Sequence, residues 1–200
     1  MKTINLIFLT TILAIALFLF GGRIEPASLA SAGMASIPDA QTITLTAIQD
    51  TFVSKAYPTT NYGSGSSMTL GWTASGSDWR VQLDFDLSTL PANAQVSSAT
   101  LTLFAEVNLA QSDSPQEIFY VYPYAIDADW SEATVNWNDR PTASHWNDPA
   151  AAVNNANTEI QWSVTEIVKA WASGRQPKDG ILLLSDQTVE GYHRFVTKEG

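Results

Sequence analysis

The segment RVQLDFDL, residues 80–87, alternates between polar and apolar residues along its whole length. Successive side chains of an extended strand point to opposite faces, so every second residue shares a face. A period of two is typical of a β-strand with one buried and one solvated face. We therefore expect a sheet that packs its apolar face against a core. That face carries Val81, Leu83, Phe85 and Leu87, and the other face carries Arg80, Gln82, Asp84 and Asp86.

The alternation returns along most of the chain, with clusters of Gly, Pro, Asn, Asp and Ser between the segments. Many short strands separated by turns predict an all-β fold, an antiparallel β-sandwich of jelly-roll type. One short helix is expected at 163–174, SVTEIVKAWASG, with Ser163 or Thr165 as N-cap and Gly174 after its last turn. The further predicted strands are 42–48, 98–107, 117–124, 158–164, 180–185 and 191–199.

The first 32 residues have the pattern of a signal peptide. Lys2 precedes an apolar run at 4–20, and Ala30–Ser31–Ala32 matches a cleavage motif before Gly33. An uncleaved N-terminal anchor is the alternative, and both interpretations predict a secreted, extracellular or cell-surface protein. Residues 33–46 are expected to form a flexible tether and the start of the first strand, and residues 47–200 the sandwich domain.

Composition excludes several kinds of site. The chain has no cysteine, so disulfides, thiolate metal sites and lipid attachment through cysteine are ruled out. Its 20 acidic and 10 basic residues give a net charge of −10, and the basic residues are scattered. This charge disfavours binding of nucleic acid. It also disfavours binding of anionic polymers, unless the chain holds a local basic patch.

The stretch ADWSEATVNWNDRP, residues 128–141, crowds acids and tryptophans together. Trp130 and Trp137 are interpreted as wedges that pin a loop to the sandwich. Glu132 and Asp139 are expected to accept hydrogen bonds from turn amides.

Catalysis finds little support in the sequence. Asp84 and Asp86 share one strand face at a separation compatible with the carboxylate pair of a glycosidase. The simpler interpretation is that both lie on the solvated face of the strand and that Asp86 caps the turn that follows. His145 and His193 are the only histidines and lack metal-ligand spacing. No enzyme activity is predicted.

Aromatic residues near turns are the candidates for sugar binding, since an indole or phenol offers an apolar face and a polar group. Burial in the core is the alternative for each, and it is the expected position of Trp162 and Trp171. The candidates for sugar binding are Tyr57, Tyr62, Trp72, Trp79 and Trp146, of which the three tryptophans are expected to be exposed.

Calcium is the ion that the oxygen-rich composition favours. Asp50 and Glu199 would meet if the first and last strands pair. Ordinary surface charge is the alternative interpretation of both residues.

In order along the chain, the motifs at 50–65, 80–105, 130–141, 164–174, 179–185 and 194–199 resemble the DNRLRE domain. This family is also classed as family 96 carbohydrate-binding modules and is related to disaggregatase-type repeats. The resemblance covers about Ala47 to Gly200 and implies a non-catalytic extracellular β-sandwich. Arg80 matches an arginine of the family and is the first polar candidate for sugar binding. The family continues into one more strand, so the resemblance implies a missing final strand and an open sheet edge.

These observations together predict a secreted, non-catalytic module that binds an extracellular or cell-wall polysaccharide. The resemblance implies relatives that look like polysaccharide binders, including binders of the anionic polymer alginate, although the scarcity of basic residues favours a neutral glycan here. The rival hypothesis is a structural or adhesive surface module that assembles with neighbouring domains or subunits through the open sheet edge. Apart from the leader, no contact with a membrane is expected.

Overall fold

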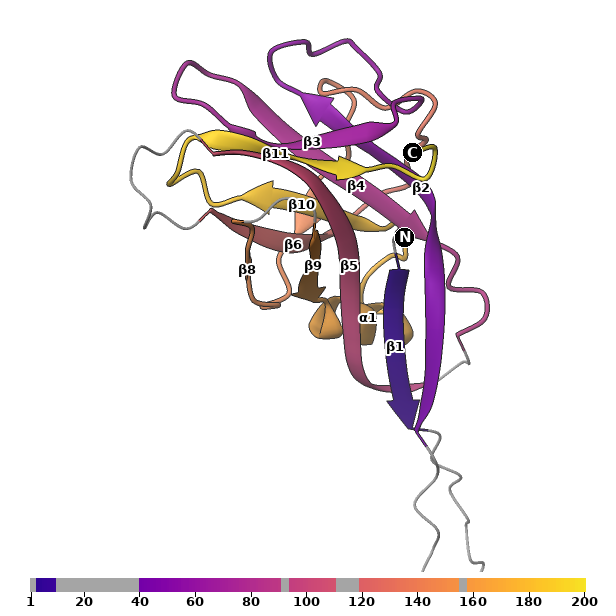
Figure 1. Cartoon of the computed structure of the whole chain (residues 1–200). Coiled ribbons are helices and arrows are strands. Elements are labelled where there is room, and N and C mark those ends of the chain that lie inside the picture. Colours follow the sequence, from indigo (N-terminus) through magenta and orange to yellow (C-terminus); the bar gives the residue numbers. More distant parts are fainter. Residues whose placement is uncertain (1–2, 10–39, 91–93, 111–118, 155–157) are drawn as a thin grey trace, which may run out of the picture.

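The computed structural model describes residues 3–9, 40–90, 94–110, 119–154 and 158–200 (Figure 1). The predicted cleavage motif at Ala30–Ser31–Ala32 and most of the predicted tether lie outside these residues. In chain order the elements are β1 (Thr3–Leu9), β2 (Gln41–Ser54), β3 (Ser67–Trp72), β4 (Asp78–Phe85), β5 (Gln95–Ala110), β6 (Tyr120–Ile126), β7 (Ala143–Ser144), β8 (Ala151–Ala152), β9 (Thr158–Ser163), α1 (Thr165–Ala172), β10 (Ile181–Ser185) and β11 (Gly191–Val196).

The strands form the antiparallel β-sandwich that the sequence predicts, with one short helix. Hydrogen-bonded neighbours follow the order β2-β1-β5-β11-β3-β4-β10-β6-β7, and β4 also pairs with β2. The long strand β2 joins the two layers, because residues 41–46 pair with β1 and its later residues pair with β4. No described helix is long and apolar enough to cross a membrane.

The predicted alternation of β4 holds on its apolar face, since Val81, Leu83, Phe85 and Leu87 are all buried in the main core. The polar face departs from the prediction. Gln82, expected in solvent, is 0% exposed, because the segment at 127–141 folds across the outside of this layer. Burial also raises the pKa of Asp84, against the lowering effects of hydrogen bonds from the Phe85 amide and the Gln49 side chain.

A second, smaller core lies beneath the segment at 127–141. Trp130 is buried in it and donates its indole N–H to the carbonyl of Asp179 at 2.8 Å, so its predicted role as a wedge is confirmed. Trp137 is only half-buried at the edge of this core. The members are Val53, Ile126, Trp130, Val135 and Leu182, with Tyr124, Trp137 and Ala143 packed against them.

The acids of this segment do not act as predicted. The carboxylate of Glu132 pairs with the ammonium of Lys198, and that of Asp139 accepts a hydrogen bond from the side-chain amide of Asn136. The side chain of Asn136, rather than an acid, accepts the turn amides of residues 138 and 139. The prediction failed because the partner of Glu132 comes from the far end of the chain.

Helix α1 begins and ends close to the predicted positions. Its C-terminus follows the expected pattern, because Gly174 adopts a left-handed φ of 70°. The predicted N-cap is wrong: the cap position is Val164, which makes no side-chain capping bond. The carboxylate of Asp148 caps the helix from a distant loop instead.

Strand β1 lies between β2 and β5 (Figure 1). Its residues 3–9 belong to the segment that the sequence predicts as a leader. A strand at this place was not predicted from the sequence.

Candidate functional site

Three of the predicted sugar-binding residues converge on one surface groove, which we call the aromatic groove. Tyr57, Tyr62 and Trp79 line it, and Tyr192 of β11 completes its aromatic wall. Its volume is about 420 Å³. The remaining lining residues are Phe52, Ser67, Thr69 and Arg194.

The loop between β2 and β3 holds the two tyrosines in different ways. The Tyr62 ring stacks on Phe52, with centroids 4.2 Å apart and planes 24° from parallel, so its position is fixed by packing. The neighbouring Asn61 donates its side-chain amide to the carbonyls of Glu132 and Val135, at 2.7 and 2.8 Å. Tyr57 is 63% exposed and can reorient toward a ligand.

The far wall of the aromatic groove comes from the strand register. Pairing of β3 with β4 and with β11 brings Trp79 and Tyr192 together, with ring centroids 5.7 Å apart. The Arg194 guanidinium donates to the Ser67 hydroxyl at 2.6 Å. Aromatic walls beside hydroxyl and guanidinium groups suit a ligand that has both apolar faces and hydroxyls.

Sequence reasoning missed Tyr192 and Arg194. The alternation in GYHRFV, residues 191–196, places both on the face opposite His193 and Phe195, which are buried. That pattern marks them as surface residues. Only the pairing of β11 with β3 brings them beside Trp79.

Trp72 and Trp146 lie outside the aromatic groove and are half-buried against the main core. The Trp72 indole donates to the carbonyl of Val189 at 2.8 Å. The Trp146 indole donates to the side-chain oxygen of Gln176 at 3.2 Å, with the Arg175 guanidinium 5.1 Å from the ring centroid. The expected burial of Trp162 and Trp171 is confirmed.

Arg80 lies in a second depression on the outer face of β4, β10 and β6, which we call the arginine groove. Its guanidinium pairs with the carboxylate of Asp78 at 2.8 Å. The guanidiniums of Arg80 and Arg140 both contact the Trp137 ring, 4.8 and 3.9 Å from its centroid. Further lining residues are Tyr122, Tyr124, His145 and Leu184.

The arginine groove brings two guanidiniums together, with the carboxylates of Asp78 and Asp186 beside them. Burial, and then the neighbouring charge of Arg80, lower the pKa of Arg140, while Asp78 opposes this effect. Two guanidiniums held on one indole can direct donors toward a negatively charged or hydroxyl-rich group. The scattered basic residues in the sequence gave no sign of this arrangement.

Asp50 and Glu199, predicted as calcium ligands, meet in the structure together with Glu132. Carboxylate oxygens of the three residues lie within 4.8 Å of one another. The ammonium of Lys198 already pairs with Glu132 and Glu199, and its backbone N–H donates to Asp50 at 2.9 Å. Burial acts to lower the pKa of Lys198, but its hydrogen bonds to the two glutamates outweigh that effect and raise the pKa. The cluster has the hard oxygen ligands that calcium prefers, and a lysine competes for them.

The two strand-face acids that could form a catalytic pair are each held locally. Asp84 accepts hydrogen bonds from Gln49 and from its neighbour Phe85. Asp86 accepts the backbone N–H of Ser88 at 2.9 Å, as the turn-capping interpretation predicts.

The sequence model of carbohydrate-binding module family 96 matches residues 41–200. The chain belongs to this family. It is therefore a carbohydrate-binding module, and the resemblance noted in the sequence is confirmed. A search of curated proteins found no match to the chain. The matched residues begin at the first residue of β2 and include both grooves of this carbohydrate-binding module.

Proposed function

We propose that the protein is a secreted, non-catalytic module that binds an extracellular or cell-wall polysaccharide in the aromatic groove. The observation that carries this proposal is the convergence of Tyr57, Tyr62, Trp79 and Tyr192 on one open groove. Family membership supports carbohydrate as the ligand class. The groove's open shape suits a segment within a chain as well as a chain end.

The groove offers both kinds of contact that a sugar needs. The Trp79 indole and the Tyr57 ring can cover the C–H faces of successive sugar rings, which aromatic faces attract. The Arg194 guanidinium and the Ser67 hydroxyl can exchange hydrogen bonds with sugar hydroxyls. Tyr62 is the rigid part of the wall because it stacks on Phe52.

The arginine groove supplies a second contact in this proposal. Arg80 and Arg140 would donate to hydroxyls, or to carboxylates if the polysaccharide is acidic. The strong negative charge of the whole chain still favours a neutral polysaccharide over an anionic one.

Binding of the full chain to insoluble polysaccharides and to soluble ones in affinity gels tests the proposal. The panel should contain neutral glucans, mannans and xylans beside uronate polymers. Retention by at least one polysaccharide is expected, and it should disappear with Tyr57→Ala and Trp79→Ala. Tyr120→Ala is a matched control, because Tyr120 is 38% exposed on β6 and lines neither groove. Absence of binding to the whole panel would refute the proposal.

Secretion is part of the same proposal and rests on the pattern of residues 1–32. Mass spectrometry of the protein from the culture medium should give a chain that begins at Gly33. An intact N-terminus retained with the cells would support an uncleaved anchor instead.

We also propose that calcium strengthens the fold at Asp50, Glu132 and Glu199. The support is the approach of three carboxylates from distant parts of the chain. A calcium ion there would tie β2, the segment at 127–141 and the residues after β11 together.

A further inference from the structure

The loop between β2 and β3, residues 55–66, carries two aromatic side chains of the aromatic groove, Tyr57 and Tyr62. Residues 55–61 are all exposed, so the core of the sandwich does little to hold this part of the loop. An exposed segment with few buried contacts opens locally at a low cost in free energy. The order of the loop therefore depends on its contacts with other parts of the chain.

Asn61 makes the first of these contacts. Its side-chain amide donates to the carbonyls of Glu132 and Val135, at 2.7 and 2.8 Å. Its side-chain oxygen accepts the backbone N–H of Gly63 at 3.2 Å, which closes a turn inside the loop. An asparagine amide has two N–H donors, and these two carbonyls occupy both. Asn61 does not line the aromatic groove, so it holds the loop and not a ligand.

The loop also approaches the segment at 127–141 closely through its backbone. A Cβ atom on Gly63 would lie 2.2 Å from the carbonyl oxygen of Glu132, so any larger residue would push the loop away from this segment. A further backbone bond runs from the N–H of Asn138 to the carbonyl of Pro58, at 3.1 Å. The segment at 127–141 is thus the support on which the first half of the loop lies.

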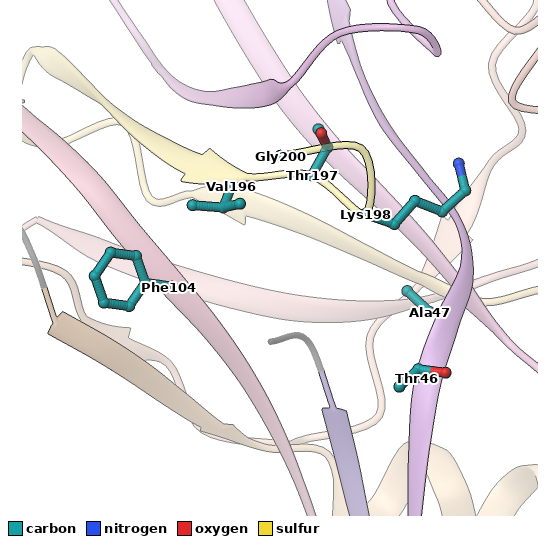
Figure 2. Close-up of a pocket in the computed structure, with 7 residues that line it drawn as sticks. All are labelled: Thr46, Ala47, Phe104, Val196, Thr197, Lys198 and Gly200. Atoms are coloured by element: carbon teal, nitrogen blue, oxygen red, sulfur yellow. The ribbon is translucent and has the colours of Figure 1, made fainter.

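Thr197 holds the second half of the loop. It lies in the turn that follows β11 (Figure 2). Its hydroxyl donates to the carbonyl of Gly65 at 2.7 Å, and its backbone N–H donates to the carbonyl of Ser66 at 3.1 Å. Thr197 is 3% exposed and does not line the aromatic groove. The loop is therefore fastened on both sides of Tyr62, by two parts of the chain that are distant in sequence.

These two tethers bear directly on the aromatic wall. Tyr62 stacks on Phe52 between them, and Tyr57 extends from the exposed part of the loop that precedes Asn61. Side chains that are already in place when a ligand arrives lose little conformational entropy on binding, and this raises affinity. The affinity of the groove then depends on residues that lie outside it.

We propose that Asn61 and Thr197 are positioning residues of the aromatic groove. They hold the loop in the conformation that presents Tyr57 and Tyr62 to a polysaccharide, and they do not contact the sugar themselves. The inference rests on the proposed function, because it concerns the affinity of the same groove. Loss of either tether should weaken polysaccharide binding while the sandwich stays folded.

Affinity gels with the full chain, and with the polysaccharide that it retains, test the proposal. Asn61→Asp keeps the size and the acceptor of the side chain but removes both donors, and Asn61→Ala is its uncharged companion. Each should weaken binding by about fivefold or more, as expected for the net loss of a hydrogen bond. Asn138→Ala is the matched control and should bind as the wild type, because Asn138 is exposed and contacts the loop through its backbone N–H.

Thr197 allows a test by conservative rescue. Thr197→Val keeps the shape of the side chain but lacks the hydroxyl, and it should weaken binding by about fivefold or more. Thr197→Ser keeps the hydroxyl and should bind within about twofold of the wild type. Equal losses in the two variants would show that the packing of the methyl group, and not the tether to Gly65, matters.

The order of the loop can be measured without any ligand. A nitroxide on Thr59→Cys is the single label in a chain without native cysteine, and Thr59 is an exposed loop residue that does not line the groove. Its electron paramagnetic resonance spectrum should shift toward faster motion in Asn61→Asp and Thr197→Val, and should not shift in Asn138→Ala. The urea midpoint of Asn61→Asp should stay nearly unchanged, because the residue lies in an exposed loop.

Wild-type affinity together with an unshifted spectrum in Asn61→Asp would overturn the positioning role. A lowered affinity that is matched by a general fall in the urea midpoint would also overturn it, since Asn61 would then act on the whole fold. A wild-type chain that binds no polysaccharide would instead refute the proposed function. The two failures are therefore distinguished by the behaviour of the wild type.

Discussion

The carboxylate of Asp148 accepts a hydrogen bond from the backbone N–H of Ile167 at 2.9 Å. Its other oxygen accepts the N–H of Glu166 at the same distance. A helix leaves its first N–H groups unpaired, and here a residue from a separate loop satisfies two of them. This contact ties the loop before β8 to the start of α1.

Asp148→Ala should lower the free energy of unfolding by roughly 1–2 kcal/mol, since a helix cap is lost and two amides are left without a partner. Chemical denaturation monitored by tryptophan fluorescence measures the loss. Asp148→Asn is the control and should recover part of it, because its side-chain oxygen can still accept one bond. A loss no greater than that of an exposed Asp139→Ala would contradict the capping role.

Trp130→Ala should destabilise the fold by about 3–5 kcal/mol, as expected for a large buried aromatic residue that also loses its indole hydrogen bond. Trp137→Ala should cost less, roughly 1–2 kcal/mol, because Trp137 is half-buried and mainly supports the guanidiniums of Arg80 and Arg140. Comparison of the two urea midpoints checks this order. The reverse order would show that the small core depends on Trp137.

His193 predicts a pH dependence of stability. The ring is buried beside Phe119, and among the described residues neither of its nitrogens has a hydrogen-bond partner. Burial lowers the pKa of His193 from 6.5 to about 4. At pH values between these two pKa values, His193 is protonated in the unfolded chain and neutral in the folded chain. The free energy of unfolding therefore falls as the pH drops from about 6.5 toward 4.

The contribution of His193 to this loss should reach about 3 kcal/mol near pH 4. Urea unfolding of the wild type and of His193→Leu between pH 7.5 and 4 measures it as the change in their difference. A difference that stays constant over this range would show that His193 does not titrate on unfolding.

Tyr57→Ala and Trp79→Ala should each weaken polysaccharide binding by about tenfold or more, if each ring covers one sugar face. Tyr57 is largely exposed, so its replacement should leave the unfolding midpoint nearly unchanged. Affinity gels and thermal melts of the same preparations separate binding from folding. Undiminished binding by both variants would place the glycan elsewhere, and Arg80→Ala and Arg140→Ala then test the arginine groove.

Calcium at saturating concentration should raise the melting temperature relative to the protein in chelator, because an ion that binds only the folded state stabilises it by about 2.7 kcal/mol at a hundred times its Kd. Glu132→Gln should abolish the rise. Lys198→Met is an informative companion, since removal of the competing ammonium should strengthen calcium binding. An identical melting temperature with and without calcium would refute the proposed calcium site.

The amino-acid sequence by itself determined most of the longer strands and the main core, although β1, β3, β7 and β8 were not predicted. Val81, Leu83 and Phe85 are buried as their period of two predicts, because alternation reports directly which side chains share a face. The aromatic residues beside turns were also recognisable, and Tyr57, Tyr62 and Trp79 do line one groove.

Only the tertiary structure decided which distant residues meet. Gln82 looks solvent-exposed in its strand, yet the segment at 127–141 covers it. Tyr192 reaches Trp79, and Glu132 reaches Asp50, through strand pairing and loop packing across more than 80 residues of chain. The physical reason is that periodicity reflects the burial of a residue relative to its own neighbours in the chain. Sites are assembled instead by the pairing of strands, and this pairing depends on the packing of the whole sandwich.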